Sequence, residues 1–171
     1  THQLAASTQP TSLLIEKCSI YEGDRSLRVE EIAQSAAFKE ATTGAPNLGL
    51  SNDWQYVKFH YEPNTANEQA LCYIGNSSIE HIELYRIGEH TTLLHTAGST
   101  IGSAIEYTTP SGFALPIAGN EAGDYMLRLK SSKQLIAPIY AGESNRILRM
   151  AGKEDAIMFL YRSEEHTSEL Q

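Results

Sequence analysis

Apolar and polar residues alternate along residues 54–61, a stretch that also carries the only tryptophan of the chain. Successive side chains of a β-strand point to opposite faces of its sheet, so the alternation predicts a strand with two different faces. The face predicted to join the core carries Val57, Phe59 and Tyr61. The opposite face carries Trp54, Tyr56, Lys58 and His60. The side chains of this second face could pack on the sheet with their polar ends in solvent, or they could contact a ligand.

Short apolar segments occur on both sides of this strand, and turns rich in Gly, Pro, Asn and Ser separate them. Such a pattern is typical of an antiparallel β-sandwich or barrel. The other segments predicted as strands are 13–20, 70–74, 79–87, 92–97, 105–108, 113–117, 125–131 and 135–140. One short helix is predicted before most of these strands. Its apolar residues Val29, Ile32, Ala33 and Ala36 recur at the spacing of one helix face. Phe38 is expected to hold this helix on the sheet. We therefore expect an all-β fold with one short helix near the N-terminus.

The composition fits one soluble-type domain rather than two, because 171 residues with 41% hydrophobic and 20% charged residues are values of a single globular domain. Nine Tyr against four Phe favour sheet over a helical bundle. The formal net charge of −8 argues against nucleic acid or an anionic membrane surface as partner, because both attract a concentrated positive patch. An uncharged or cationic small ligand stays open.

Motifs of catalysis are missing from the sequence: it contains no GxSxG, no HExxH and no phosphate-binding GxxxxGK[ST]. His81, His90 and His95 could meet around a metal, but their spacing matches no known ligand pattern. The glycine-rich residues 98–103 lack a following Lys and are expected to form a loop. We therefore expect neither an enzyme nor a bound metal or cofactor.

Two cysteines, Cys18 and Cys72, lack the CxxC spacing of a metal or redox site. They could form one disulfide in an oxidising compartment, or they could be two buried thiols. The sequence leaves both alternatives open.

Both ends of the chain differ from the middle. Residues 1–12 are mostly polar and small, and Ala5-Ala6-Ser7 resembles the region after a signal-peptide cleavage site, so we expect an exported N-terminal segment. Residues 144–161 end in the apolar run 157–161, which is either the start of a truncated membrane helix or an element that closes the sandwich. Residues 162–171 read like a translated sequencing adapter and are excluded from the fold prediction.

Aromatic residues beside cations form the candidate ligand surface. Sugar rings stack on Trp and Tyr, while charged groups bind the hydroxyls. The candidate ligand-binding residues are Trp54, Tyr56, Lys58 and Arg128. The alternative is that the aromatic rings pack on the sheet and Arg128 pairs with a carboxylate.

The order and spacing of several motifs between about Ile20 and Tyr140 resemble a known family. This is the second type of extracellular domain of bacterial seven-transmembrane receptors with diverse intracellular signalling modules (7TMR-DISM). The motifs are residues 26–32 with Phe38, 47–49, the strand after Trp54, 82–85, 96–98, 113–116, 125–132 and 137–140.

Three positions depart from the family pattern. Lys58 stands where the family usually has Arg, which keeps the charge but loses the planar fork of donors. The tryptophan of the family's first core strand is replaced by Tyr56, with Trp54 two residues earlier on the same face. Tyr140 also stands where Trp is common.

The resemblance implies a jelly-roll β-sandwich, similar to carbohydrate-binding modules, over residues 13–143. It implies a periplasmic sensor domain tethered to the bacterial inner membrane, followed by a seven-helix membrane domain and a cytoplasmic signalling module such as a histidine kinase or a diguanylate cyclase. The expected ligand is a carbohydrate or another small molecule. In this interpretation residues 144–161 are a juxtamembrane segment with the start of a truncated membrane helix.

Two further hypotheses fit the same sequence. The domain could be a carbohydrate-binding module of a secreted enzyme, in which case a catalytic domain would flank it. It could also be a structural or adhesion β-sandwich without a small ligand.

Overall fold

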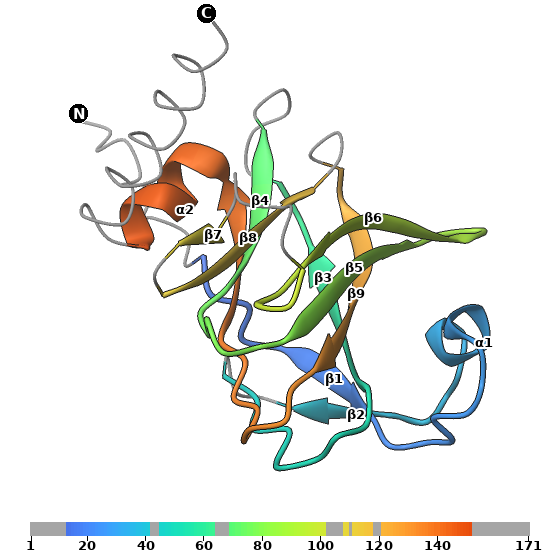
Figure 1. Cartoon of the computed structure of the whole chain (residues 1–171). Helices are drawn as coiled ribbons and strands as arrows, with labels where there is room; N and C mark the ends of the chain where they lie inside the picture. The colour runs from blue at the N-terminus through green and yellow to red at the C-terminus, as the bar shows by residue number, and fades with distance from the viewer. Residues whose placement is uncertain are drawn as a thin grey trace, which may run out of the picture.

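Two antiparallel sheets pack face to face in the computed structural model, which describes residues 13–41, 45–63, 69–101, 108–109, 111–117 and 121–151. In these residues a six-stranded sheet has the order β2-β1-β3-β9-β5-β6, and a four-stranded sheet has the order β10-β4-β8-β7 (Figure 1). The strands of the larger sheet are β1 (Cys18–Tyr21), β2 (Phe38–Ala41), β3 (Gln55–Tyr61), β5 (His81–Ile87), β6 (Thr91–Ala97) and β9 (Gly123–Lys130). Those of the smaller sheet are β4 (Ala70–Ile74), β7 (Thr108–Thr109), β8 (Gly112–Ile117) and β10 (Ile139–Glu143). The predicted all-β sandwich is confirmed, whereas the jelly roll, a finer description, stays a prediction.

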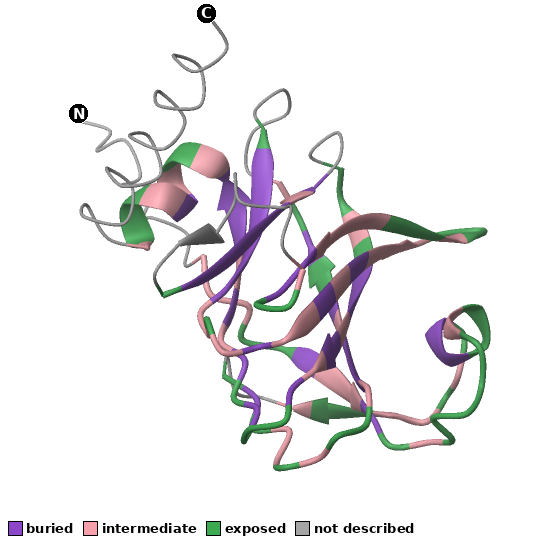
Figure 2. Cartoon of the chain, viewed as in Figure 1, coloured by how far each residue is buried: buried purple, intermediate pink, exposed green. Residues whose placement is uncertain are grey.

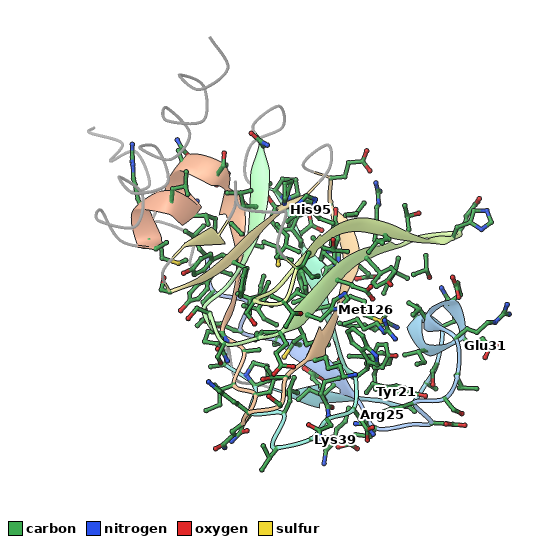
Figure 3. The ribbon with its side chains drawn as sticks, in the orientation of Figure 1. Tyr21, Arg25, Glu31, Lys39, His95 and Met126 are labelled. Carbon is green, nitrogen blue, oxygen red and sulfur yellow. The ribbon has the colours of Figure 1, made fainter. Side chains whose placement is uncertain are left out.

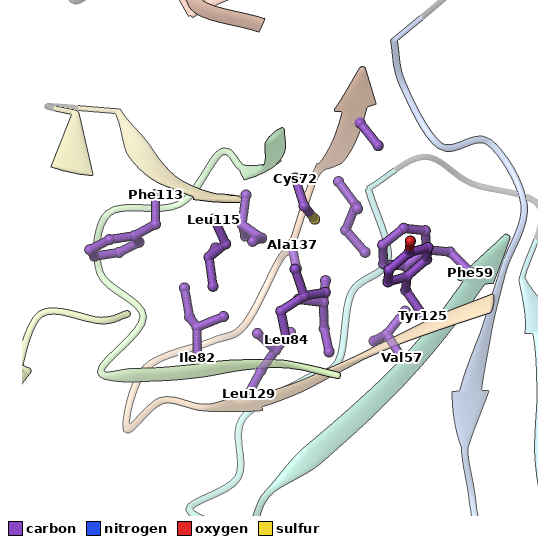
Figure 4. Packing of buried hydrophobic residues seen from close by; sticks show 14 of the residues in the cluster. Val57, Phe59, Cys72, Ile82, Leu84, Phe113, Leu115, Tyr125, Leu129 and Ala137 are labelled. Carbon is purple, nitrogen blue, oxygen red and sulfur yellow. The ribbon is translucent and has the colours of Figure 1, made fainter. Parts of the chain in front are cut away.

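The core lies between the sheets and is built by alternate residues of the strands (Figure 4). Val57, Phe59 and Tyr61 point into it from β3, as the alternation predicts. Leu127 of β9 and Leu115 of β8 meet them there, and both are fully buried. Burial of these apolar side chains supplies the main driving force for packing the two sheets.

Each outer face of the sandwich carries a helix, and Figure 1 shows the two helices on opposite sides. The helix α1 (Val29–Ala33) packs Ile32 and Ala33 on the six-stranded sheet, against Tyr56 and Met126. The helix α2 (Ser144–Met150) packs Ile147 on the four-stranded sheet, in a cluster with Leu71, Tyr73 and Ala114. Consequently β4 is buried on both of its faces, as its continuous purple colour in Figure 2 shows.

The helix α1 is confirmed, but it is shorter than the apolar spacing predicts. It has five residues, and no side chain caps its N-terminus at Arg28. Ala36 is exposed beyond the helix end, and the chain turns into β2, a strand that the sequence pattern does not predict. Phe38 begins β2 and packs against the same cluster as Ile32, as expected for a residue that holds the helix on the sheet. The helix therefore depends on its contacts with the sheet.

The turn before β3 is set by Asn47 and Gly49. The Asn47 side-chain oxygen accepts a hydrogen bond from the Gly49 amide at 3.0 Å, and Gly49 has a φ of 77°, which favours glycine. The same segment pairs with residues 135–137, because the Leu48 amide donates to the Leu135 carbonyl and Asn47 bridges Ile136. This pairing explains why β10 begins only at Ile139 and not at the predicted residue 135.

The first predicted strand is likewise shorter than expected. Regular pairing begins at Cys18, while Leu14 forms an isolated bridge with Tyr140 of the other sheet. The remaining predictions at the ends of the chain concern residues 1–12 and 152–171, which lie outside the described residues, as do residues 105–107 of a predicted strand. Among the described residues no helix has the length and apolar character to cross a membrane.

Cys18 and Cys72 are both buried in the core, and no disulfide joins them in the described residues. Burial raises the pKa of the Cys72 thiol to about 12, and it also raises that of Cys18. The structure thus shows the buried-thiol alternative and not the disulfide.

Candidate functional site

Two neighbouring groups of polar side chains lie on the outer face of the six-stranded sheet, the face that carries α1. We call the first the arginine cluster; its members are Trp54, Tyr56, His81, Glu83, Tyr85, Arg128 and Lys130. The strand register creates it, because Arg128 of β9 lies between Tyr56 of β3 and Glu83 of β5. Met126, which is the next outward residue of β9, faces α1 together with Tyr21, and both are labelled in Figure 3.

Arg128 is the centre of the arginine cluster. Its Nη1 lies 2.8 Å from Glu83 Oε1, and its Nε donates a hydrogen bond to the Tyr56 hydroxyl oxygen at 3.2 Å. The guanidinium carbon lies 3.6 Å from the centre of the Trp54 ring. Only 21% of the Arg128 side chain and 14% of the Glu83 side chain are exposed, so the ion pair is largely shielded from water. Nε and Nη1 of Arg128 are thus both engaged within the chain.

Glu83 has further partners. The Tyr85 hydroxyl donates to its Oε1 at 2.9 Å, and His81 Nε2 lies 3.4 Å from its Oε2. Burial on its own raises the pKa of the Glu83 carboxyl, but hydrogen bonds from Arg128 and Tyr85 outweigh it, so the pKa lies below the ordinary 4.5. The pKa of the Tyr85 hydroxyl shifts upward instead. Burial is the largest cause, and the hydrogen bond to Glu83 is the second. Glu83 is therefore a carboxylate at neutral pH, held by three side chains.

The second group lines an open groove of about 420 Å³ beside α1, which we call the lysine groove. Its sheet side comes from β1, β3 and the start of β9, while Ala33 and Gln34 at the end of α1 form a wall. The polar side chains that line it are Lys17, Ser19, Gln34, Lys58, His60 and Asp124, with Glu40 at the edge strand β2. Hydrogen-bond donors and acceptors therefore surround a space of the size that a small ligand needs.

Lys58 reaches into this groove from β3. Its Nζ lies 4.4 Å from the centre of the Phe38 ring. Burial lowers the pKa of its ammonium group, and the negative charge of Asp124 partly offsets this effect. Within the described residues, Lys58 makes a contact with an aromatic ring but no side-chain hydrogen bond or ion pair.

His60 lies between two carboxylates at the other side of the groove. Its Nδ1 is 2.9 Å from Asp124 Oδ1, and its Nε2 is 2.8 Å from Glu62 Oε1. The hydrogen bond with Glu62, and then that with Asp124, raise the pKa of His60 above the ordinary 6.5. The side chain is 54% exposed, so solvent weakens these interactions.

Of the predicted ligand-binding residues, the structure brings Trp54, Tyr56 and Arg128 into direct contact. Lys58 lies on the same face, as the alternation predicts, but its ammonium points to Phe38 and the groove. Tyr56 is only 1% exposed and Arg128 pairs with Glu83, which is the packing alternative stated above. A ligand role of these residues stays a prediction.

Several residues of both groups do not stand out in the sequence. Glu83, His81 and Tyr85 alternate on one face of β5, which was a usable signal for the arginine cluster. The contact of His60 with Asp124 depends on the register of β3 with β9, and no short sequence pattern reports it. Among the described residues no three His, Cys, Asp or Glu side chains form a group that could hold a metal ion.

Comparison with models of known protein families gives one description for most of the chain. The model described as 7TMR-DISM extracellular 2 matches residues 17–143. This range contains β1 to β10 and α1, and with them both the arginine cluster and the lysine groove. A search of curated proteins finds no match.

Proposed function

The chain belongs to the 7TMR-DISM extracellular 2 family of extracellular sensor domains of receptors, and we propose that it senses a small polar molecule, such as a carbohydrate, bound in the lysine groove. The domain acts without catalysis. In the full-length protein it lies in the periplasm, tethered to the inner membrane by a seven-helix domain that carries a cytoplasmic signalling module.

The lysine groove is the observation that carries this proposal. Its volume of about 420 Å³ falls in the range of roughly 300–1,000 Å³ found for small-molecule sites. Ser19, Gln34 and Asp124 offer the hydroxyl, amide and carboxylate groups that bind sugar hydroxyls. Ala33 and Ile87 also line the groove and add an apolar surface on which the C–H face of a ring can pack.

The position of α1 suggests how binding is transmitted. Ala33 lines the groove and at the same time packs against the outer face of the sheet with Ile32, Tyr56 and Met126. If α1 can occupy two positions on the sheet, a ligand that contacts Ala33 or Gln34 binds the protein with a different affinity in each of them. Such a difference in affinity is what shifts a two-state equilibrium, and the shift reaches the membrane domain through the packing of the sandwich.

A tryptophan placed in the groove tests the proposal. Gln34 is exposed at the end of α1, so Gln34→Trp fills the groove without disturbing the core. Gln134→Trp is the matched control, because Gln134 is exposed outside the groove. We expect a carbohydrate panel to contain ligands that raise the melting temperature of the wild-type protein and of Gln134→Trp, but not of Gln34→Trp.

Two outcomes contradict the proposal. If Gln34→Trp responds to the ligand as the wild type does, the site lies elsewhere. If no sugar or other small polar metabolite of a broad panel changes the melting temperature, the sensor works without a small ligand in this groove.

A further inference from the structure

We propose that the lysine groove selects ligands that carry an anionic group, and that Lys58 binds this group. The inference rests on the proposed function, because it specifies the chemistry of the molecule that the same groove binds.

Lys58 differs from Arg128, the partly buried arginine of the same outer face, because Arg128 pairs with Glu83 at 2.8 Å. Lys130 resembles Lys58 in having an aromatic ring, that of Trp54, near its ammonium group, but it does not line the groove. Lys58 is also partly buried, but within the described residues its ammonium group makes no side-chain hydrogen bond or ion pair and lies 4.4 Å from the centre of the Phe38 ring. An ammonium group has three N–H donors, so Lys58 keeps donors free for a ligand in the groove.

Within the described residues the carboxylates of the groove form no hydrogen bond or ion pair with Lys58, although the charge of Asp124 acts on it. Asp124 Oδ1 lies 2.9 Å from His60 Nδ1, so this carboxylate already has a hydrogen-bonded partner. Glu40 is exposed on the edge strand β2, where water surrounds it. An anionic ligand therefore finds donors of Lys58 available without breaking an existing side-chain hydrogen bond.

The surroundings make this contact stronger than one at the open surface. Lys58 is partly desolvated, and a charge–charge hydrogen bond gains strength as the local dielectric constant falls. The Phe38 ring holds the end of the side chain in the groove, which reduces the entropy lost when a ligand binds. Lys17, exposed at the edge of the groove, adds a second positive charge.

Three sugars that differ only at the sixth carbon test the inference: glucose, glucuronate and glucose 6-sulfate. Calorimetric titration of the folded domain at low salt should give a dissociation constant for the charged sugars roughly tenfold or more below that for glucose, as expected for one charged hydrogen bond. Comparison of glucuronate with the sulfate tells whether the preferred anion is a carboxylate or a sulfate.

Variants assign the effect to Lys58. Lys58→Met keeps a flexible unbranched side chain but lacks the ammonium group, so it should remove the preference for the charged sugars, whereas Lys58→Arg should retain it. Lys133→Met is the control, because Lys133 is an exposed lysine that does not line the groove. Circular dichroism spectra of all variants check that each of them is folded.

Equal affinity for glucose and the two charged sugars overturns the inference, and it leaves the proposed function intact if Gln34→Trp blocks all three. An unchanged preference in Lys58→Met overturns the role of Lys58. Binding of none of the three sugars overturns the inference as well, and the broader panel described above then decides the proposed function separately.

Discussion

Arg128 and Lys58 are two cations on one face of one sheet, and their surroundings differ in a way that separates structure from recognition. Arg128 has a carboxylate, a hydroxyl and an aromatic ring as partners. Lys58 has one aromatic ring and a groove. The planar guanidinium suits several fixed partners, while the ammonium is a compact charge that adapts to an incoming group. The comparison predicts that the arginine cluster stabilises the sheet beside the groove proposed to bind a ligand.

The largest expected effect comes from removing the carboxylate partner of Arg128. Glu83→Ala leaves the guanidinium largely buried without its counter-charge, and we expect the free energy of unfolding to fall by about 2 to 3 kcal/mol. Urea denaturation measures the change. The matched control is Glu31→Ala in the exposed pair Arg28–Glu31, which should cost no more than about 0.5 kcal/mol. Similar losses in the two variants would mean that the arginine cluster does not stabilise the sheet.

A smaller effect is expected for Arg128→Lys, which keeps the charge beside Glu83. The variant loses the hydrogen bond to Tyr56 and the planar contact with Trp54, so the free energy of unfolding should fall by about 1 to 2 kcal/mol. The measurement is again urea denaturation, with Arg86→Lys as control, because Arg86 is more exposed. An unchanged stability would show that charge alone matters at this position.

Acid should weaken the arginine cluster through Glu83. The pKa of Glu83 is lower in the folded chain than its ordinary 4.5, so its contribution to stability is present above that pH and is lost as the pH falls through the lower folded value. We expect the difference in stability between wild type and Glu83→Gln to be constant near neutral pH and to shrink below about pH 4.5. Urea denaturation of both proteins from pH 7 to pH 3 measures it. A constant difference throughout would rule out this linkage.

The smallest effect on stability is expected at Lys58. The methionine of Lys58→Met can pack on Phe38 as the lysine stem does, so the free energy of unfolding should change by no more than about 0.5 kcal/mol. Thermal and urea denaturation measure it. If this variant is as unstable as Glu83→Ala, the proposed difference between Arg128 and Lys58 is wrong, because Lys58 would then also stabilise the fold.

The sequence predicts the faces of the strands better than it predicts their neighbours. A period of two is enough to assign Val57 and Phe59 to the core and Lys58 to the outer face. The pairing of Arg128 with Glu83 joins residues 45 positions apart, and it depends on a register that only the folded sheet defines. The family resemblance supplies the fold but not this contact.

Local patterns also fail where tertiary contacts outweigh them. Residues 38–41 have no strong alternation of their own, yet they form β2 because β1 offers its free edge. Residues 135–137 have the pattern of a strand, but they pair with the turn before β3 instead of with the four-stranded sheet. The sequence therefore predicts that residues of the arginine cluster and the lysine groove share one face, but it does not predict that they form two separate groups.

The short helix α1 has a consequence for the kinetics of the groove wall. A helix of five residues without a side-chain cap is unstable on its own, so α1 persists through the packing of Ile32 and Ala33. Its backbone amides should therefore exchange with deuterium through local opening, far faster than those of the buried strand β9. A molecule bound against Ala33 would slow that exchange, which makes the amides of α1 a built-in reporter of occupancy.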